Sequence, residues 1–265
     1  MKIDGCSALI TGASAGIGHE FTRQLAGRAR SLILVARREQ KLSELRDELR
    51  QHYPNLTVHI RNTDLADLAQ LKELMAWIDH ERIDVDLLIN NAGLGDYGPF
   101  ATSDPIRNEQ IMLVNMVALT SLARHLLPQM IARKRGGILN VSSSAGFLPI
   151  PGLAIYAATK AHVTSFSEAL RAELRGTGVS VCALCPGPVH TEFQEVAKRV
   201  NGQREDGPEF VHVSVEQVVR DGITGLEADR PLVVPGLPMK IAMFLVRLTP
   251  MFILRWASRF SPKRP

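Results

Sequence analysis

Short apolar segments alternate with longer segments of helical spacing along most of this chain. The pattern predicts strands at 6–11, 32–36, 56–60, 85–90, 137–141, 179–184 and 232–234. It predicts helices at 17–29, 39–52, 68–80, 106–133 and 156–175, and one more that Ser214 caps, with Gln217 completing a capping box. Consecutive parallel strands need crossover connections, which are usually helical. We therefore expect an α/β, doubly wound fold, with helices on both faces of a mostly parallel seven-stranded sheet.

Length and composition fit one large globular domain. The chain has 265 residues, of which 45% are hydrophobic and 22% charged, as in globular proteins and unlike disordered or fibrous chains. We expect a single domain over residues 1–236, including a polar, mobile loop at 187–213. Residues 237–265 then form a basic, apolar C-terminal extension that packs on the domain or on a partner.

Positive charge is concentrated towards the C-terminus. The formal net charge is +4, yet residues 230–265 contain seven lysines and arginines and no acidic residue. The first 229 residues are therefore net negative. A body of this charge has no broad basic face, which argues against a nucleic-acid partner.

Three cysteines are too few for a disulfide framework, which indicates a reducing compartment. Cys182 and Cys185 form a CxxC pair, but residues three apart on a strand point to opposite faces. We expect buried thiols and no metal site. The first residues show no apolar signal sequence, and the apolar stretch 232–256 is broken by prolines and basic residues. These features predict a cytoplasmic protein.

A glycine-rich turn follows the first predicted strand. The sequence TGASAGIG at 11–18 opens the first helix, and its glycines are spaced G-x3-G-x-G rather than the commoner GxGxxG. Glycines let backbone N–H groups approach a pyrophosphate, and the helix dipole favours an anion there. Many strand–helix turns contain glycine, but this place in a βαβ unit favours a Rossmann-type dinucleotide site.

The end of the second predicted strand indicates which dinucleotide binds. NAD-binding proteins commonly have an acidic side chain there, whereas this chain has Arg37 and Arg38. A guanidinium suits a 2′-phosphate, so NADP(H) is favoured over a merely solvated arginine pair. Asp64 is a candidate acceptor for the adenine amino group or a plain turn aspartate. The sequence NNAG at 90–93 either adjoins the cofactor or forms a simple turn.

Three side chains after the fifth predicted strand indicate acid–base chemistry. Tyr156 and Lys160 share one helix face, and Ser143 directly follows the strand. A phenol has a pKa of about 10, which a nearby ammonium lowers by favouring the phenolate. Ser143 would hold a substrate oxygen close to the phenol. Tyr-x3-Lys often occurs by chance, so alone this pair favours a packed aromatic and a solvated helix lysine. Its occurrence together with Ser143 and the glycine-rich turn reverses that weighting and favours catalysis.

Together these motifs resemble the short-chain dehydrogenase/reductase family over residues 5–191. The resemblance implies that Tyr156 is the general acid/base and that Lys160 lowers its pKa and binds the nicotinamide ribose. It implies that Ser143 orients the carbonyl and that Asn115 holds a water extending a proton relay. The implied cofactor contacts are Gly12, Ser14, Gly16, Ile17, Gly18, Arg37, Arg38, Asp64, Leu65, Asn91, Ala92, Gly93, Tyr156, Lys160, Pro186, Gly187 and Thr191. It also implies a homodimer or homotetramer, paired through the helices of Asn115 and Tyr156.

Apolar residues surround the expected reaction centre. They are Leu94, Tyr97 and Phe100, the segment 147–151, and Phe193 and Val196 at the start of the substrate loop. Part of this set is expected to be core, but such a wall favours a lipophilic ketone, aldehyde or 3-oxoacyl substrate. His190 is a candidate second acid or a loop histidine without a role. The expected activity is NADP(H)-dependent interconversion of a small-molecule carbonyl and an alcohol.

Two other classes of function fit less well. A non-enzymatic dinucleotide-binding sensor would not need Ser143, Tyr156 and Lys160 together. A serine hydrolase needs a histidine base and a G-x-S-x-G turn, which VSSSA at 141–145 does not provide. The C-terminal extension has two interpretations: a helix that covers the substrate pocket or a partner subunit, and a basic amphipathic helix in peripheral contact with a membrane.

Overall fold

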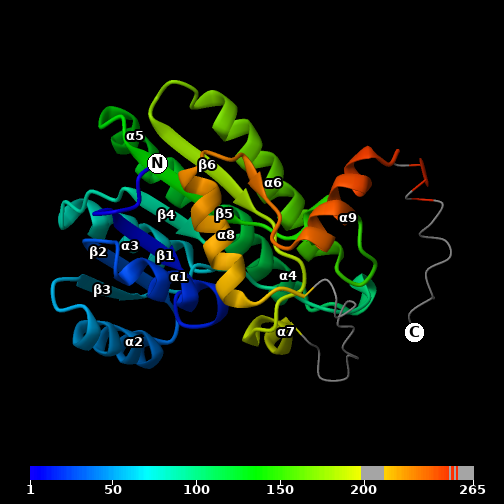
Figure 1. Cartoon of the computed structure of the whole chain (residues 1–265). Coiled ribbons are helices and arrows are strands. Elements are labelled where there is room, and N and C mark those ends of the chain that lie inside the picture. The colour runs from blue at the N-terminus through cyan, green and yellow to red at the C-terminus, as the bar shows by residue number, and fades with distance from the viewer. Residues whose placement is uncertain (198–211, 251, 254, 256–265) are drawn as a thin grey trace.

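The computed structural model describes residues 1–197, 212–250, 252, 253 and 255 (Figure 1). These residues contain one seven-stranded sheet in the order β3-β2-β1-β4-β5-β6-β7, in which every neighbouring pair is parallel. The strands are β1 Ser7–Thr11, β2 Ser31–Ala36, β3 Thr57–Asn62, β4 Leu87–Asn90, β5 Gly136–Val141, β6 Val179–Leu184 and β7 Leu232–Val233. The chain order reverses between β1 and β4, where doubly wound sheets bind ligands. The predicted α/β, Rossmann-type fold is confirmed.

Helices connect the strands on both sides of the sheet. They are α1 Gly16–Ala26, α2 Glu39–His52, α3 Leu68–His80, α4 Pro105–Met112, α5 Leu119–Ala132, α6 Ala154–Glu173, α7 Glu192–Ala197, α8 Val215–Glu227 and α9 Leu237–Leu248. The shorter turns are η1 Phe100–Thr102, η2 Leu113–Ala118, which is a π-helix, and η3 Ser144–Phe147.

The strands alternate between two cores. In β1, Ala8 and Ile10 join the core under α1, α2 and α8, whereas Leu9 joins the core under α3, α4, α5 and α6. Successive side chains of a strand point to opposite faces of the sheet, and helices cover both faces here. Both sets of side chains are therefore apolar, which explains why the strands are unbroken apolar runs in the sequence. Figure 1 shows the sheet between these two helical layers.

Capping residues fix where several helices begin. Asp67 accepts hydrogen bonds from Ala69 N and Gln70 N at the start of α3. Asp104 accepts from Ile106 N at the start of α4, and Ser214 accepts from Gln217 N at the start of α8. These side chains satisfy N–H groups that lack intrahelical partners. The N-cap predicted at Ser214 is confirmed.

Two predicted segments differ from the observed ones. The helix expected at 106–133 is continuous from α4 to α5, but the π-helix η2 interrupts its α geometry. The loop expected at 187–213 contains the short helix α7, and its residues 198–211 lie outside the described part of the chain. The other predicted strands and helices differ from the structure only by a few residues at their ends.

One helical segment among the described residues, Pro105–Ala132, is long and apolar enough to cross a membrane. Its buried side chains, including Ile111, Leu122 and Met130, belong to the core below the sheet. Packing in that core explains its apolar character without a membrane.

Two glycines between α6 and β6 give a matched test of the fold. Both have a left-handed φ, +79° at Gly176 and +82° at Gly178, but only at Gly178 would a Cβ collide with the main chain of Lys134. Gly176→Ala should lower the free energy of unfolding by about 1 kcal/mol, the cost of a left-handed residue with a Cβ. Gly178→Ala should lower it by at least about 3 kcal/mol, because the collision adds to that strain. Urea unfolding measures both, and equal losses would contradict this packing.

Candidate active site

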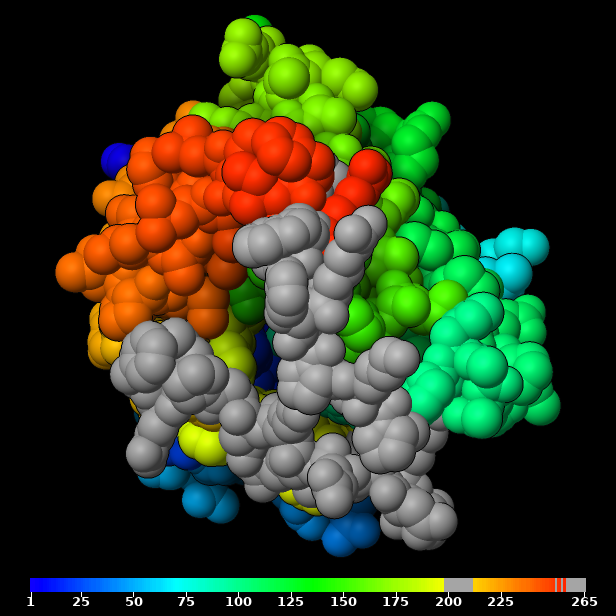
Figure 2. All heavy atoms as spheres, turned by 90° about the vertical axis from the view of Figure 1, so that its right-hand side faces the viewer, coloured from blue at the N-terminus to red at the C-terminus, as the bar shows by residue number. Residues whose placement is uncertain are grey.

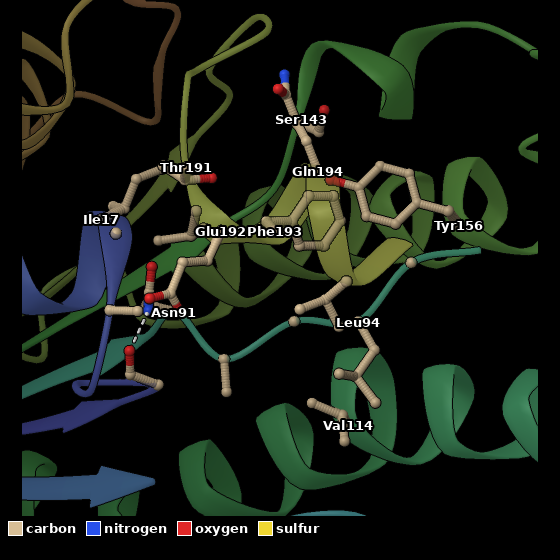
Figure 3. Close-up of a pocket in the computed structure, with 18 of the residues that line it drawn as sticks. Ile17, Asn91, Leu94, Val114, Ser143, Tyr156, Thr191, Glu192, Phe193 and Gln194 are labelled. Atoms are coloured by element: carbon tan, nitrogen blue, oxygen red, sulfur yellow. Dashed lines mark hydrogen bonds between the residues drawn. The ribbon is translucent and has the colours of Figure 1, made fainter. Parts of the chain in front are cut away.

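A cavity of about 580 Å³ opens at the carboxyl ends of the central strands. It is lined by nearly all the residues predicted to bind or react: Gly12, Ser14, Gly16, Ile17, Arg37, Arg38, Asp64, Leu65, Asn91, Ala92, Gly93, Ser143, Tyr156, Lys160, Pro186, Gly187 and Thr191. Gly18 and Asn115 do not line it. Figure 3 shows Ser143 and Tyr156 on one wall and Ile17, Asn91 and Thr191 towards the other.

The glycine-rich turn is held by the loop after β4. Thr11 Oγ1 accepts hydrogen bonds from Asn91 N and Ala92 N, both at 3.0 Å, and Asn91 Nδ2 donates to Thr11 O at 2.9 Å. A Cβ on Gly18 would collide with the carbonyl oxygen of Gly12 and the amide of Asn91. Gly18 therefore permits this close packing, while Gly12 and Gly16 line the cavity with little more than main chain. Such a cradle of backbone fits a pyrophosphate.

Ser143, Tyr156 and Lys160 converge on the cavity from β5 and α6. Ser143 is the N-cap of η3, where its Oγ accepts from Ala145 N at 3.1 Å. Lys160 is 3% exposed, and its Nζ donates to Val141 O at 2.8 Å and lies 5.7 Å from the ring centre of Tyr156. The Phe193 ring packs on Tyr156 from α7, with 5.4 Å between the ring centres (Figure 3). This arrangement fixes a phenol, an amine and a hydroxyl around one space.

Burial dominates the protonation of this group. It raises the pKa of Tyr156 to about 12, against the opposing effect of a hydrogen bond with Ser143. It lowers the pKa of Lys160 to about 8. Lys160 is not among the causes of this shift, so the lowering of the Tyr156 pKa by Lys160 remains a prediction for the complex with the oxidised cofactor. The Lys160 Nζ donates to the Val141 carbonyl, and desolvation of the phenol sets the direction of the Tyr156 shift.

Asn115 lies in the π-helix η2 and is 1% exposed. Its Nδ2 donates to Leu94 O at 2.9 Å and to Thr159 Oγ1 at 3.0 Å, and its Oδ1 accepts from Leu94 N at 2.8 Å. The family resemblance implies that Asn115 holds a relay water. In the structure both ends of its amide instead bond to protein groups and fix the loop after β4. The widened π turn is a common feature of functional sites and places the amide here.

Cationic side chains at the end of β2 hold a carboxylate that the sequence did not reveal. Arg38 Nη1 lies 2.7 Å from Glu192 Oε2, and Lys41 Nζ lies 2.8 Å from Glu192 Oε1. Arg38 also donates to Ser14 Oγ. These hydrogen bonds lower the pKa of Glu192. An oxyanion is thus already held by Arg38, one of the two arginines expected to grip a 2′-phosphate, and by Lys41. The only sequence signal for it is an acid directly after Thr191.

The neighbouring candidates Arg37 and Asp64 face each other. Arg37 Nη1 lies 3.9 Å from Asp64 Oδ2, and Asp64 Oδ1 accepts from Ala66 N at 3.0 Å. Asp64 therefore also acts as a turn aspartate, as the alternative interpretation expected. Both side chains remain on the cavity wall, where they fit the adenosine end of a dinucleotide.

The apolar wall is only partly as predicted. Leu94, Tyr97, Ile150, Phe193 and Val196 line the cavity, as expected, and Val114, Leu153 and Val189 join them. The expected residues Phe100, Phe147, Leu148, Pro149 and Pro151 do not line it. Phe100 is exposed on η1, and the Phe147 ring lies under the guanidinium of Arg247 instead.

Neither His190 nor the cysteines line the cavity. The His190 ring stacks on His212 with 4.4 Å between ring centres, outside the cavity lining. The predicted buried thiols are confirmed: Cys182 and Cys185 are free, and burial raises the pKa of each to about 12. Within the described residues, no three His, Cys, Asp or Glu side chains gather as a metal site requires.

Comparison with known proteins identifies related sequences and folds. A family model described as short chain dehydrogenase matches residues 7–201. The NADP-dependent 3-hydroxy acid dehydrogenase of Escherichia coli O157:H7 is 37% identical over 71% of this chain and 75% of its own length. The very-long-chain 3-oxoacyl-CoA reductase of Pyrenophora tritici-repentis is 34% identical over 82% of this chain and 64% of its own length. The structure of a short-chain dehydrogenase from Sphingobium yanoikuyae in complex with NADPH aligns with a TM-score of 0.80, at 29% identity over 98% of each chain.

The contact of Glu192 with Arg38 and Lys41 predicts how anions compete for them. Glu192→Gln should raise the affinity for adenosine 2′,5′-bisphosphate about fivefold relative to adenosine 5′-monophosphate, because two exposed ion pairs no longer have to break. Isothermal titration calorimetry measures both ligands. Glu195→Gln, the same change further along α7, is the control and should leave the ratio unchanged. An unchanged or lower ratio in Glu192→Gln would contradict the competition.

The lowered pKa of Lys160 predicts a pH-dependent stability. Below pH 8 the folded protein carries this charge at a desolvation cost. Between about pH 8 and 10.5 the unfolded chain binds the proton and the folded protein does not, so the cost fades. The stability advantage of Lys160→Met over the wild type should therefore shrink by about 2–3 kcal/mol between pH 7.5 and 10.5. The other titrating groups are the same in both proteins, so their contributions cancel in the difference between the two free energies of unfolding. If urea unfolding shows that this difference does not change with pH, the buried charge is refuted.

Proposed function

The chain belongs to the short-chain dehydrogenase/reductase family, and from that premise we propose that it reduces a lipophilic ketone, aldehyde or 3-oxoacyl substrate to an alcohol with NADPH. The convergence of Ser143, Tyr156 and Lys160 on the cavity that the glycine-rich turn also lines carries this proposal. A hydroxyl donor, a phenol and a cation around one space are what carbonyl reduction requires.

The cofactor end of the cavity fits NADP(H). Arg38, Lys41 and Ser14 form a cluster of donors that already binds the carboxylate of Glu192 and matches the charge of a 2′-phosphate. The pyrophosphate would lie against the main chain of Gly12 and Gly16 at the start of α1. In support, one relative is named as NADP-dependent, and a similar structure was solved with NADPH.

Each reactive side chain has a distinct task in the proposed reduction. When bound, NADPH would supply the hydride that reduces the carbonyl carbon. Tyr156 gives its hydroxyl proton to the carbonyl oxygen, which Ser143 holds through a hydrogen bond. With its raised pKa the phenol keeps its proton at neutral pH, as an acid must before it donates. The Lys160 ammonium stabilises the phenolate that results, and Asn115 positions the wall by fixing the loop after β4.

The wall of the cavity supports a lipophilic substrate. Leu94, Ile150, Leu153 and Val196 present hydrocarbon, and Phe193 packs on the reacting phenol. A volume of about 580 Å³ accommodates a cofactor end and a medium-sized organic molecule. The names of the two relatives, a 3-hydroxy acid dehydrogenase and a 3-oxoacyl-CoA reductase, agree with oxidation or reduction at a carbon near an acyl group.

We propose the same organisation of domains and subunits that the sequence indicates. Residues 1–236 form the catalytic domain, and 237–265 an extension. The chain is a cytoplasmic homodimer or homotetramer paired through α4, α5 and α6. Exposed Ile106, Met112 and Ile131 on the first two of these helices support this pairing, because contact would cover apolar surface.

Removal of one oxygen atom tests the proposed chemistry. Tyr156→Phe should lower kcat with a panel of lipophilic carbonyls by at least about 10²-fold, since the general acid is lost while the ring remains. NADPH affinity should change little. Loss of NADPH absorbance at 340 nm measures turnover, and NADPH fluorescence measures binding.

Tyr53→Phe is the matched control, because Tyr53 ends α2 on the protein surface. It should leave turnover unchanged. Normal turnover in Tyr156→Phe would refute the assignment. Tight NADPH binding by the wild type without turnover of any carbonyl would favour a dinucleotide-binding sensor instead.

A further inference from the structure

Helix α9 exposes a continuous apolar stripe. Five of its side chains are 52–69% exposed: Leu237, Ile241, Phe244, Leu245 and Leu248. Their spacing of three and four residues places them on one face of the helix. We refer to these five residues as the α9 stripe. Phe252 and Ile253, also exposed, follow it along the chain.

The opposite face of α9 holds the helix on the domain. Met239 and Met243 are buried there, 7% and 8% exposed. The helix is therefore apolar on both sides, although the domain covers only one. Figure 2 shows α9, in orange and red, at the surface of the molecule. Soluble proteins seldom leave a row of large apolar side chains uncovered unless the row contacts something.

Basic residues border the stripe. Lys240 is exposed, and Arg247 lies 3.3 Å from Glu168 and over the ring of Phe147. The whole segment 230–265 contains seven lysines and arginines and no acidic residue. An occupant of this surface must therefore offer both hydrocarbon and negative charge.

A second copy of the chain meets only half of that requirement. A two-fold contact brings the same patch of each subunit together, so the stripe would be covered but the exposed Lys240 of each subunit would lie in the same interface. An anionic lipid surface meets both needs. Its acyl region takes up an apolar helix face that lies in the plane of the membrane, and its headgroups attract lysine and arginine.

We propose that the α9 stripe docks this protein on an anionic membrane surface, peripherally and without spanning it. The stripe enters the headgroup–acyl boundary, while Met239 and Met243 keep the helix attached to the domain. Lys240, which is exposed beside the stripe, contacts the lipid phosphates. Docking needs no change in the fold, because the stripe already faces outwards.

The position of α9 gives this docking a consequence for the substrate. Helix α9 packs against η3, the turn that follows Ser143 and contributes Ser144 and Ala145 to the cavity wall. A docked molecule therefore holds the reaction side of its cavity near the lipid. This consequence rests on the proposed function, and it supplies a route for a lipophilic carbonyl that partitions into membranes.

Vesicle flotation tests the docking on the full chain, without substrate or cofactor. Wild-type protein should float with vesicles of phosphatidylcholine and phosphatidylglycerol, and should largely remain in the dense fraction with phosphatidylcholine alone. Leu245→Glu should lower partitioning into the anionic vesicles at least about tenfold, because one leucine no longer inserts. Leu68→Glu, the same change at an exposed position of α3, should partition as the wild type does.

Each other outcome decides against docking. Absence of wild-type flotation on anionic vesicles would overturn the proposal, as would equal flotation on neutral vesicles or undiminished flotation of Leu245→Glu. A molar mass in solution that falls in Leu245→Glu, without wild-type flotation, would assign the stripe to a second copy. NADPH affinity, measured in parallel, confirms that both variants are folded. Because flotation needs no turnover, its failure leaves the proposed oxidoreductase activity standing, and a failure of turnover leaves the docking standing.

Discussion

The desolvation of a half-buried phenol and a buried amine, which lie on adjacent turns of α6 beside the end of β5, is the constraint around which this site is arranged. Burial moves the pKa values of Tyr156 and Lys160 in opposite directions, to about 12 and about 8. Both shifts favour the uncharged forms, which is what a desolvated pocket imposes. Binding of a charged cofactor and a polar substrate beside them would change the protonation of Tyr156 and Lys160. The reactive protonation states are therefore expected only in the complex.

The sheet supplies the hydrogen-bond partners that stabilise these desolvated groups. Val141 ends β5, and its carbonyl accepts a hydrogen bond from Lys160. Asn115 fixes the loop after β4, and that loop lines the pocket from the neighbouring strand. Parallel strands bring these chain segments to one edge although they are far apart in sequence. The same edge carries the glycine-rich turn after β1, so cofactor and acid meet at the reversal of strand order.

The strands, and the side chains that share a helix face, were predictable from the spacing of residues in the sequence. Features that depend on contacts between distant segments, or on desolvation, were not. Apolar alternation identified the strands, and the spacing of Tyr156 and Lys160 on one helix face placed them correctly. The sequence did not reveal that Asn115 would bond to the loop after β4, since that depends on a π turn within an otherwise ordinary helix. It did not reveal Glu192, whose partners precede it by about 150 residues. Nor did it reveal the direction of the Tyr156 shift, which depends on desolvation.

The ionisation of Tyr156 tests this account most directly. Carbon-13 NMR of tyrosine labelled at Cζ follows each phenol through a pH titration, and the Tyr156→Phe spectrum assigns the resonance. In the cofactor-free protein the account predicts that Tyr156 is still largely protonated at pH 10.5–11, where an ordinary phenol, with its pKa of about 10, is mostly ionised. A Tyr156 resonance that titrates at or below pH 10 would contradict it.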